Sequence, residues 1–217
     1  MEKIYIAIAD DHQIIRDGLS MIFNNMPQYE LLHAAKDGEE LIQLINEHKT
    51  LPDIILMDID MPNKNGLDVC EEINDKFPEV AVIFLTNHIS RKYIETAILA
   101  GGQGYLAKDS DVDTIKLAID EVFENGFYYN EYWSIDLIKS LMDKGKVKHT
   151  FGDNIVLTDR EMDVLLRICE EKTDTQIAEE LLISKLTVES YRKSLIKKIG
   201  VKKSIGLAIF AIRENLI

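Results

Sequence analysis

The first 125 residues alternate short apolar runs with amphipathic segments, and this alternation restricts the fold more than any other feature of the chain. The apolar runs predict five strands, at Ile4–Ala9, Tyr29–Ala35, Asp53–Met57, Val80–Leu85 and Gly104–Ala107. Helical patterns follow the strands, at residues 14–23, 39–47, 67–77, 91–100 and 112–124. Regular alternation of strand and helix predicts an α/β fold, with a parallel sheet and helices on both of its faces.

Polar side chains stand where four of these strands end. Asp10 and Asp11 follow the first strand, Asp58 the third, Thr86 the fourth and Lys108 the fifth. Ligands of parallel sheets bind beyond the carboxyl ends of the strands. Any one of these residues is ordinary, because a strand has to end in something polar. Their joint placement favours a shared site.

The residue types at that edge predict phosphoryl chemistry. Carboxylates held close together repel one another, so each needs a proton or a cation, and Mg²⁺ takes carboxylate and carbonyl oxygens as ligands. Lys108 can bind an incoming phosphoryl group, Thr86 can donate a hydrogen bond to it, and Asp58 can attack phosphorus to form an aspartyl phosphate. An acyl phosphate is labile, which suits a switch that has to reset.

These residues resemble the receiver domain of two-component response regulators over residues 3 to about 125. The resemblance rests on Ala9-Asp10-Asp11-His12, Met57-Asp58-Ile59-Asp60-Met61-Pro62, Asn65-Gly66-Leu67, Leu85-Thr86 and the segment 100–109. It implies a flavodoxin-like, doubly wound sheet of strand order 2-1-3-4-5. It also implies that a sensor histidine kinase phosphorylates Asp58. The other implied roles are Mg²⁺ binding by Asp10, Asp11, Asp58 and the Asp60 backbone carbonyl, phosphoryl binding by Lys108, and a switch pair of Thr86 and Tyr105.

In the implied switch, a phosphoryl group adds a charge of about −2 at Asp58. The Thr86 hydroxyl is expected to move toward that charge, and Tyr105 to turn into the space it leaves. The surface formed by the last two strands and the helix between them would then change.

An enzymatic alternative uses similar groups. Asp58-Ile59-Asp60 after an apolar strand also resembles the nucleophile motif of haloacid-dehalogenase-type phosphatases. Those enzymes place their second acidic pair after the lysine, whereas Asp10 and Asp11 precede Lys108 here. The order of the residues therefore favours the receiver.

Charge is distributed unevenly along the chain, whose formal net charge is −13. Residues 1–125 contain 24 acidic and 10 basic residues, whereas residues 150–217 contain 11 of each. Between Ile183 and Lys203, seven basic residues stand against Glu189 alone. This asymmetry predicts separate roles for the two halves, with nucleic acid as the partner of the second.

Helix-start signals divide the last part of the chain into four short helices. Capping boxes stand at Thr158-Asp159-Arg160-Glu161 and at Thr173-Asp174-Thr175-Gln176. Ser184 is the expected N-cap of a helix from Lys185 to Ile199, which Gly200 ends, and Ser204 starts the fourth. Because only Leu182-Ile183-Ser184 separates the second helix from the third, the pattern predicts a helix-turn-helix.

This part resembles the LuxR/NarL-type DNA-binding domain. The resemblance rests on 157–161, Gln176-Ile177-Ala178, Leu182-Ile183-Ser184, Thr187-Val188 and 197–201. It implies that Ser190 and Lys193 contact bases of double-stranded DNA. The implied phosphate contacts are Ser184, Lys185, Thr187, Arg192 and Lys197. Glu189 stands where the family often has lysine, and either accepts from a cytosine amino group or pairs with Lys193.

The remaining features complete the expected organisation. The divisions are a receiver at 1–125, a linker with a short helix (134–142) at 126–154, and the DNA-binding domain at 155–217. The apolar segment 205–212 exceeds what a four-helix module needs to bury, which together with the family resemblance predicts a homodimer.

Composition and the absence of certain patterns narrow the setting. Cys70 and Cys169 lie far apart without metal-ligand spacing, which argues against redox chemistry. No apolar run is long enough for a membrane span and no signal peptide is evident, so a cytoplasmic transcription regulator is expected. A signalling protein that works without DNA is the third alternative, and it predicts no salt-dependent binding to a promoter.

Overall fold

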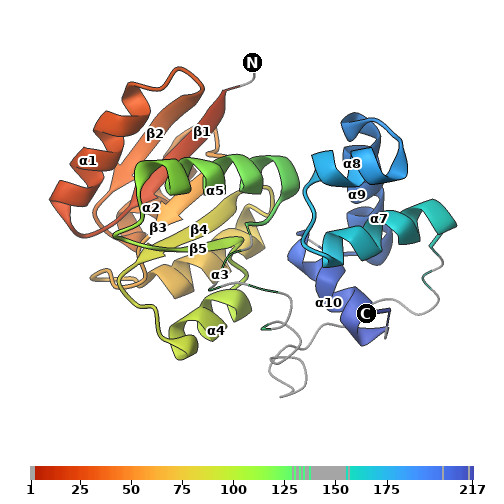
Figure 1. The fold of residues 1–217 in the computed structure, drawn as a ribbon. Helices are drawn as coiled ribbons and strands as arrows, with labels where there is room; N and C mark the ends of the chain where they lie inside the picture. Colours follow the sequence, from red (N-terminus) through yellow and green to blue (C-terminus); the bar gives the residue numbers. More distant parts are fainter. Residues whose placement is uncertain are drawn as a thin grey trace. The chain divides into compact units, whose positions relative to one another are not determined.

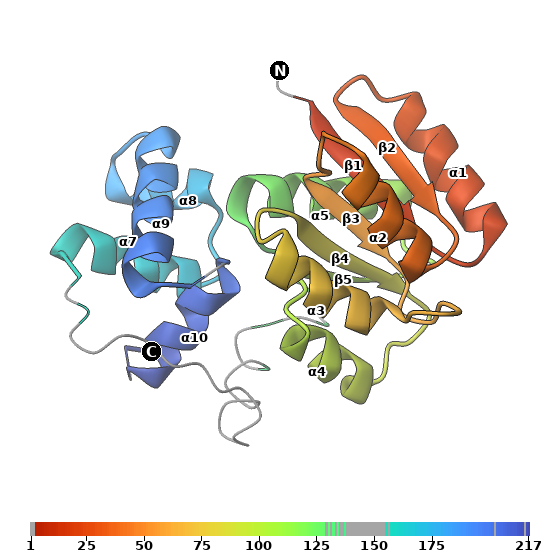
Figure 2. The same cartoon turned by 180° about the vertical axis from the view of Figure 1, so that it is seen from behind.

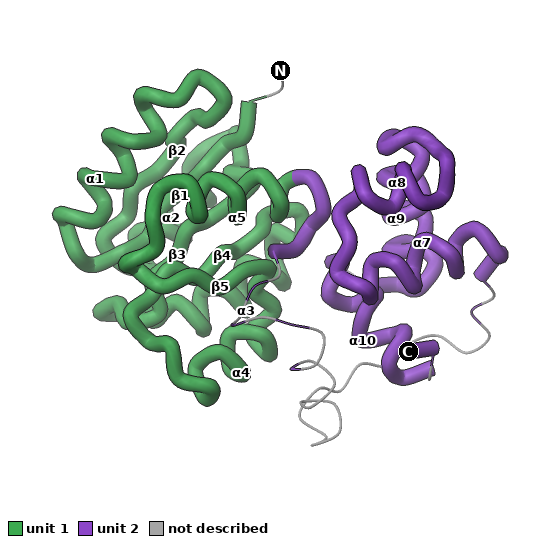
Figure 3. Tube along the Cα trace, in the orientation of Figure 1, with its two compact units in different colours: residues 1–123 green, residues 124–217 purple. Residues whose placement is uncertain are grey.

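The structure is a computed structural model that describes residues 3–128, 157–201, 203–214 and 216–217, with single residues at 130, 132, 134, 137 and 155. The chain consists of two compact units, residues 1–123 and residues 124–217 (Figure 3). Each unit is described by itself. The predicted linker and its short helix lie almost wholly outside the described residues. In the part of the chain that is described, no helix has the length and apolar character to cross a membrane.

The first unit contains a five-stranded parallel sheet of order β2-β1-β3-β4-β5 (Figure 1). Its strands are β1 (Ile4–Ala9), β2 (Tyr29–Ala35), β3 (Ile54–Met57), β4 (Ala81–Thr86) and β5 (Gly104–Ala107). The strand order predicted through the family resemblance is confirmed. Thr86 is the last residue of β4 rather than the residue after it.

Five helices cover the sheet of the first unit. They are α1 (Gln13–Asn24), α2 (Gly38–Glu47), α3 (Gly66–Lys76), α4 (Arg91–Leu99) and α5 (Val112–Asn125). Helices α1 and α5 lie over one face, and α2, α3 and α4 over the other (Figures 1 and 2). All four residues of β3 are buried, as expected for a central strand covered on both faces.

Side-chain caps fix where two of these helices begin. The Asp37 carboxylate accepts from the amide of Glu40 at 2.9 Å at the start of α2. The Asn65 side chain accepts from the amides of Leu67 and Asp68 at 2.9 and 3.0 Å at the start of α3. Each cap satisfies backbone donors that a first helical turn leaves free, so it sets the length of the loop that precedes the helix.

The second unit is helical in its described residues. Its helices are α7 (Asp159–Cys169), α8 (Asp174–Leu181), α9 (Lys185–Ile199) and α10 (Ile205–Arg213). The capping boxes predicted at Thr158 and Thr173 are both present, and Ser184 caps α9. Gly200 ends α9 in the left-handed region, with a φ of 76°. Leu165, Val188 and Leu195 lie in the core of the unit with no exposed surface.

Candidate functional site

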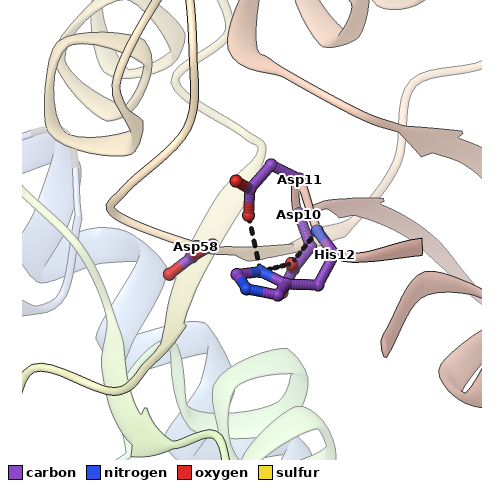
Figure 4. Close-up of side chains that lie close together, drawn as sticks. All are labelled: Asp10, Asp11, His12 and Asp58. Atoms are coloured by element: carbon purple, nitrogen blue, oxygen red, sulfur yellow. Dashed lines mark hydrogen bonds and ion pairs between the residues drawn. The ribbon is translucent and has the colours of Figure 1, made fainter. Parts of the chain in front are cut away.

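The polar residues predicted at the carboxyl edge of the sheet lie together in the structure. One ligand atom from each of Asp10, Asp11, His12 and Asp58 falls within 4.8 Å of all the others (Figure 4). The side chains of Asp10 and Asp58 are buried, whereas Asp11 is partly exposed. The three carboxylates at this spacing supply the oxygen donors that Mg²⁺ prefers, whereas the imidazole nitrogen of His12 is not a usual ligand of that ion. The donors present therefore fit the predicted Mg²⁺.

Lys108 joins the two buried carboxylates of this cluster. Its Nζ lies 2.7 Å from Asp10 Oδ2 and 2.8 Å from Asp58 Oδ2, and the lysine side chain is only 6% exposed. Burial raises the pKa of the Asp58 carboxyl, and the hydrogen bond from Lys108 opposes that rise. Burial lowers the pKa of Lys108, but the hydrogen bonds to Asp10 and Asp58 outweigh it, so the net change is upward. The lysine is therefore a fixed positive charge beside Asp58.

Gly66 permits the close approach of the loop after β3 to the start of α3. Its amide donates to the carbonyl of Ile59 at 2.9 Å. A Cβ atom at this position would overlap the backbone carbonyl oxygen of Asp58. Only glycine fits there, so Gly66 helps to hold the backbone of Asp58 in place.

Two histidines contact residues of the site, although neither was predicted to have a role there. The Nδ1 atom of His12 lies 2.6 Å from Asp11 Oδ1 and 3.3 Å from Nζ of Lys108. His88 contacts the Asp60 carboxylate through Nε2 and stacks on Tyr93, with ring centroids 4.1 Å apart. His12 directly follows the acidic pair, and that adjacency is the only sequence signal. For His88 no local signal exists, because Asp60 lies 28 residues away.

Thr86 and Tyr105, the predicted switch pair, are both fully buried. The Thr86 hydroxyl oxygen accepts from the His88 amide at 3.3 Å, and the Tyr105 hydroxyl donates to the His88 carbonyl. Tyr105 lies inside the unit in this structure, and the turn of Tyr105 into space vacated by Thr86 stays a prediction. Both side chains bond to the backbone of one residue, which links them through the loop between β4 and α4.

Arg192 corrects one of the predicted DNA contacts. Its side chain is 9% exposed, and its Nε donates to Asp174 Oδ1 at 3.1 Å, with a second contact from Nη2 to the same oxygen. Asp174 has no exposed surface. Because a charge removed from water needs a partner, Arg192 pairs inside the unit and does not face outward. The buried pair with Asp174 argues against the predicted phosphate contact of Arg192.

Glu161 joins the start of α7 to α9. Its carboxylate accepts from the Thr158 amide at 2.8 Å within the capping box, from Nζ of Lys198 at 2.7 Å and from the Ser194 hydroxyl at 3.1 Å. The hydrogen bond from Lys198, followed by that from the Thr158 amide, lowers the pKa of Glu161 to about 2. Lys198 and Ser194, both exposed residues of α9, therefore connect this helix to the start of α7.

The outer face of α9 retains other predicted DNA contacts. Ser190, Lys193 and Lys197 are exposed, while Val188, Leu195 and Ile199 face the core. Lys185 and Thr187 are partly exposed. The Ser184 side chain accepts from the Thr187 amide at 3.0 Å, so this serine acts as the N-cap. Of the two roles open to Glu189, the structure shows no ion pair with Lys193, although both residues are described.

The apolar helix α10 is more fully buried than the sequence predicted. Every residue from Ile205 to Ala211 is buried in the structure. The sequence predicted that this helix would leave apolar surface over for a second copy of the chain. That surplus is not exposed here, so α10 itself gives no support to dimerisation.

Comparison with known protein families identifies the family to which the chain belongs. A family described as the response regulator receiver domain matches residues 6–120. The chain is a two-component response regulator. The family described as bacterial regulatory proteins, luxR family, matches residues 155–211, so the regulator carries a LuxR-type DNA-binding domain after its receiver. These matches give no support to the phosphatase alternative.

Relatives of this response regulator match nearly its whole length. The oxygen regulatory protein NreC of Staphylococcus aureus (strain JH9) is 31% identical over 215 residues, covering 98% of both chains. The structure of an RcsB–DNA complex covers 96% of this chain and 98% of its own, at 23% identity and a TM-score of 0.57. The response regulator ChrA of a heme-sensing two-component system covers 100% of both chains, at 24% identity and a TM-score of 0.51. The two structures support the fold.

Proposed function

We propose that Asp58 accepts a phosphoryl group from a sensor histidine kinase and that the added charge changes how the LuxR-type domain binds promoter DNA. One observation supports the phosphorylation of Asp58. Lys108 holds two buried carboxylates within 2.8 Å of a single ammonium group, which is the arrangement needed to receive an anionic phosphoryl group beside an aspartate.

Asp58 is the nucleophile in this proposal. A carboxylate oxygen of Asp58 attacks phosphorus, the bond from phosphorus to the histidine nitrogen of the kinase breaks, and the electron pair of that bond stays on nitrogen. Lys108 keeps its proton and offsets the negative charge that gathers on the phosphoryl oxygens. Water attack on the acyl phosphate later frees Asp58 and resets the site, so phosphorylation and its reversal are the only chemistry expected of the chain.

Asp10, Asp11 and Asp58 would hold Mg²⁺, together with the backbone carbonyl of Asp60. The ion supplies positive charge that keeps the acidic side chains and an incoming phosphoryl group together. His12 lies 2.6 Å from Asp11 and orients that exposed carboxylate toward the cluster.

The switch acts through the loop that follows β4. The Thr86 hydroxyl oxygen accepts a hydrogen bond from the His88 amide, and a hydroxyl that accepts can also donate. Donation to a phosphoryl group on Asp58 would pull Thr86 toward the site and shift the His88 backbone. Tyr105 bonds to the same backbone, so a charge at Asp58 would change the surface around α4.

The LuxR-type domain is proposed to bind double-stranded DNA with the exposed face of α9. Lys193 and Ser190 would contact bases. The proposed phosphate contacts are Ser184, Lys185, Thr187 and Lys197. A homodimer is also proposed, because one of the similar structures is of two RcsB dimers bound to two parallel DNAs. A location in the cytoplasm is proposed as well, because a regulator that binds promoter DNA has to reach the chromosome.

Phospho-transfer is tested with the substitution Asp58→Asn. Wild-type chain is incubated with Mg²⁺ and a small acyl-phosphate donor, and the intact mass is measured with and without the donor. We expect one phosphoryl group on the wild type and none on the variant, because an amide cannot attack phosphorus to give an acyl phosphate.

The matched control is Asp60→Asn, which neutralises the neighbouring carboxylate but leaves the backbone carbonyl proposed as a ligand. This variant should still be labelled. If Asp58→Asn is labelled as strongly as the wild type, another residue is the phosphoryl acceptor.

A further inference from the structure

An apolar side chain stands on the face of α9 that is otherwise polar and cationic. Leu186, in the first turn of α9, is 74% exposed. Positions 186, 190, 193 and 197 are spaced at i, i+4, i+7 and i+11, so Leu186 shares one face of the helix with Ser190, Lys193 and Lys197. All four are exposed. Leu186 therefore contributes nothing to the core of its own unit.

Position along the helix places Leu186 where bases are read. In a helix-turn-helix, the second helix enters the major groove with its N-terminal residues against the base edges. Leu186 is the second residue of α9 and directly follows Lys185. Lys193 and Lys197 lie two and three turns further along, where Lys193 is proposed to contact a base and Lys197 a phosphate.

The major groove offers one apolar group to a leucine. That group is the C5 methyl of thymine, since the other base edges present hydrogen-bond donors and acceptors. We propose that Leu186 contacts a thymine methyl group and makes this regulator require thymine at one position of each half-site. The proposal rests on the DNA binding proposed above and adds a specificity residue to it.

DNA fits this face better than a protein partner does. An apolar docking surface needs several neighbouring apolar side chains, whereas the neighbours of Leu186 on the same face are a hydroxyl and two ammonium groups. Burying Lys193 and Lys197 against protein would leave two charges without water. The same two charges are stabilising beside DNA, whose base edges and phosphates both offer acceptors.

The test compares thymine with uracil, which lacks only the methyl group. Duplexes are selected from a random pool with the full-length chain, and each thymine of a selected duplex is replaced by uracil in turn. At one position we expect uracil to weaken binding of the wild type about fourfold, the loss expected when one buried methyl group is removed. Leu186→Ala should bind the thymine and uracil duplexes equally well. Alanine favours helix at an exposed position, so the variant is expected to fold.

Leu182→Ala is the matched control, because Leu182 is 91% exposed but lies in the turn before α9. It should keep the methyl effect. The proposal is overturned when uracil weakens the wild type and Leu186→Ala by the same factor, when no position responds to uracil, or when the effect is lost in Leu182→Ala instead. A chain that selects no duplex contradicts the DNA-binding function, whereas tight binding without a methyl effect contradicts the role of Leu186 alone.

Discussion

Arg192 and Asp174 form an ion pair inside the second unit, and each would be costly to bury alone. Removing one partner of a buried ion pair typically destabilises a protein by about 3–5 kcal/mol. We therefore expect Arg192→Ala to lower the free energy of unfolding of this unit by about that amount. Urea unfolding followed by hydrogen exchange of the α7–α10 amides measures the unit separately from the receiver.

Lys193→Ala is the control for this prediction. Lys193 is adjacent in sequence and carries the same charge, but it is exposed. Its removal should change stability by less than about 0.5 kcal/mol and weaken DNA binding instead. Equal loss of stability in the two variants would show that the pair with Asp174 adds nothing.

Arg192 and Lys193 show how far the sequence predicts which single residues are buried and what they contact. Position 192 falls four residues after Val188 and three before Leu195, so helical spacing alone puts it on the buried face. A basic residue on a buried helix face needs an acidic partner inside the unit, so the sequence already indicated that Arg192 pairs internally. The identity of that acid was not, because Asp174 belongs to another helix and only tertiary packing brings the two together.

At the scale of elements, two glycines in the receiver should respond to alanine in opposite ways. Gly66→Ala places a Cβ atom against the carbonyl of Asp58, which is backbone and cannot move aside cheaply. We expect this variant to be less stable and to be labelled more slowly by the acyl-phosphate donor. Thermal unfolding and the labelling rate measure the two effects.

Gly18→Ala is the matched control, since nothing lies within 4 Å of a Cβ at that exposed helical position. Alanine in a helix interior is favoured over glycine by about 0.5–1 kcal/mol, so this variant should be more stable and labelled at the normal rate. A Gly66→Ala protein as stable as the wild type would mean that the loop after β3 is not tightly held.

Glu161 makes the contact between α7 and α9 dependent on pH. Its pKa is lowered from 4.5 to about 2, so the folded state favours the charged form. The stabilisation is fully present above the unfolded value of 4.5 and is lost as the pH falls toward 2. The difference in unfolding free energy between the wild type and Glu161→Gln should shrink over that range.

Urea unfolding of both proteins at several pH values, followed by circular dichroism, measures this difference. Other carboxylates titrate in both proteins and cancel in the comparison. A difference that stays constant from pH 4.5 down to 2 would contradict the contribution of the Glu161 carboxylate.

Elements were more predictable than the contacts between loops. Periodicity located all five strands, and capping residues located the starts of α7, α8 and α9, because both signals lie within a few neighbouring residues. The parallel topology then brought Asp10, Asp58 and Lys108 to one edge. The contact of His88 with Asp60 depends on how loops fold over that edge, and no local pattern encodes it, whereas His12 is marked only by its position next to Asp11.

At the scale of the whole molecule, the uneven charge along the sequence corresponds to two units with different tasks. The acidic residues of the receiver include those that form its cation and phosphoryl site, while the exposed lysines of α9 lie in the other unit. Arg192 pairs with Asp174 inside the second unit, and the exposed Lys198 pairs with Glu161, so both pairs reduce the positive charge that faces outward. DNA affinity should therefore depend on a small number of lysines, Lys193 and Lys197 among them.

Phosphorylation of the receiver is expected to change how the second unit binds DNA, and the DNA affinity at a fixed salt concentration measures this coupling. The dissociation constant of a selected duplex is measured for the wild type and for Asp58→Asn, each with Mg²⁺, with and without the acyl-phosphate donor. We predict that the donor strengthens binding by the wild type at least about fivefold, as typical couplings between sites do, and leaves the variant unchanged. The mass of the wild type is measured in parallel to show that it carries the phosphoryl group. If the phosphorylated wild type binds DNA with unaltered affinity, phosphorylation of Asp58 is not coupled to DNA binding.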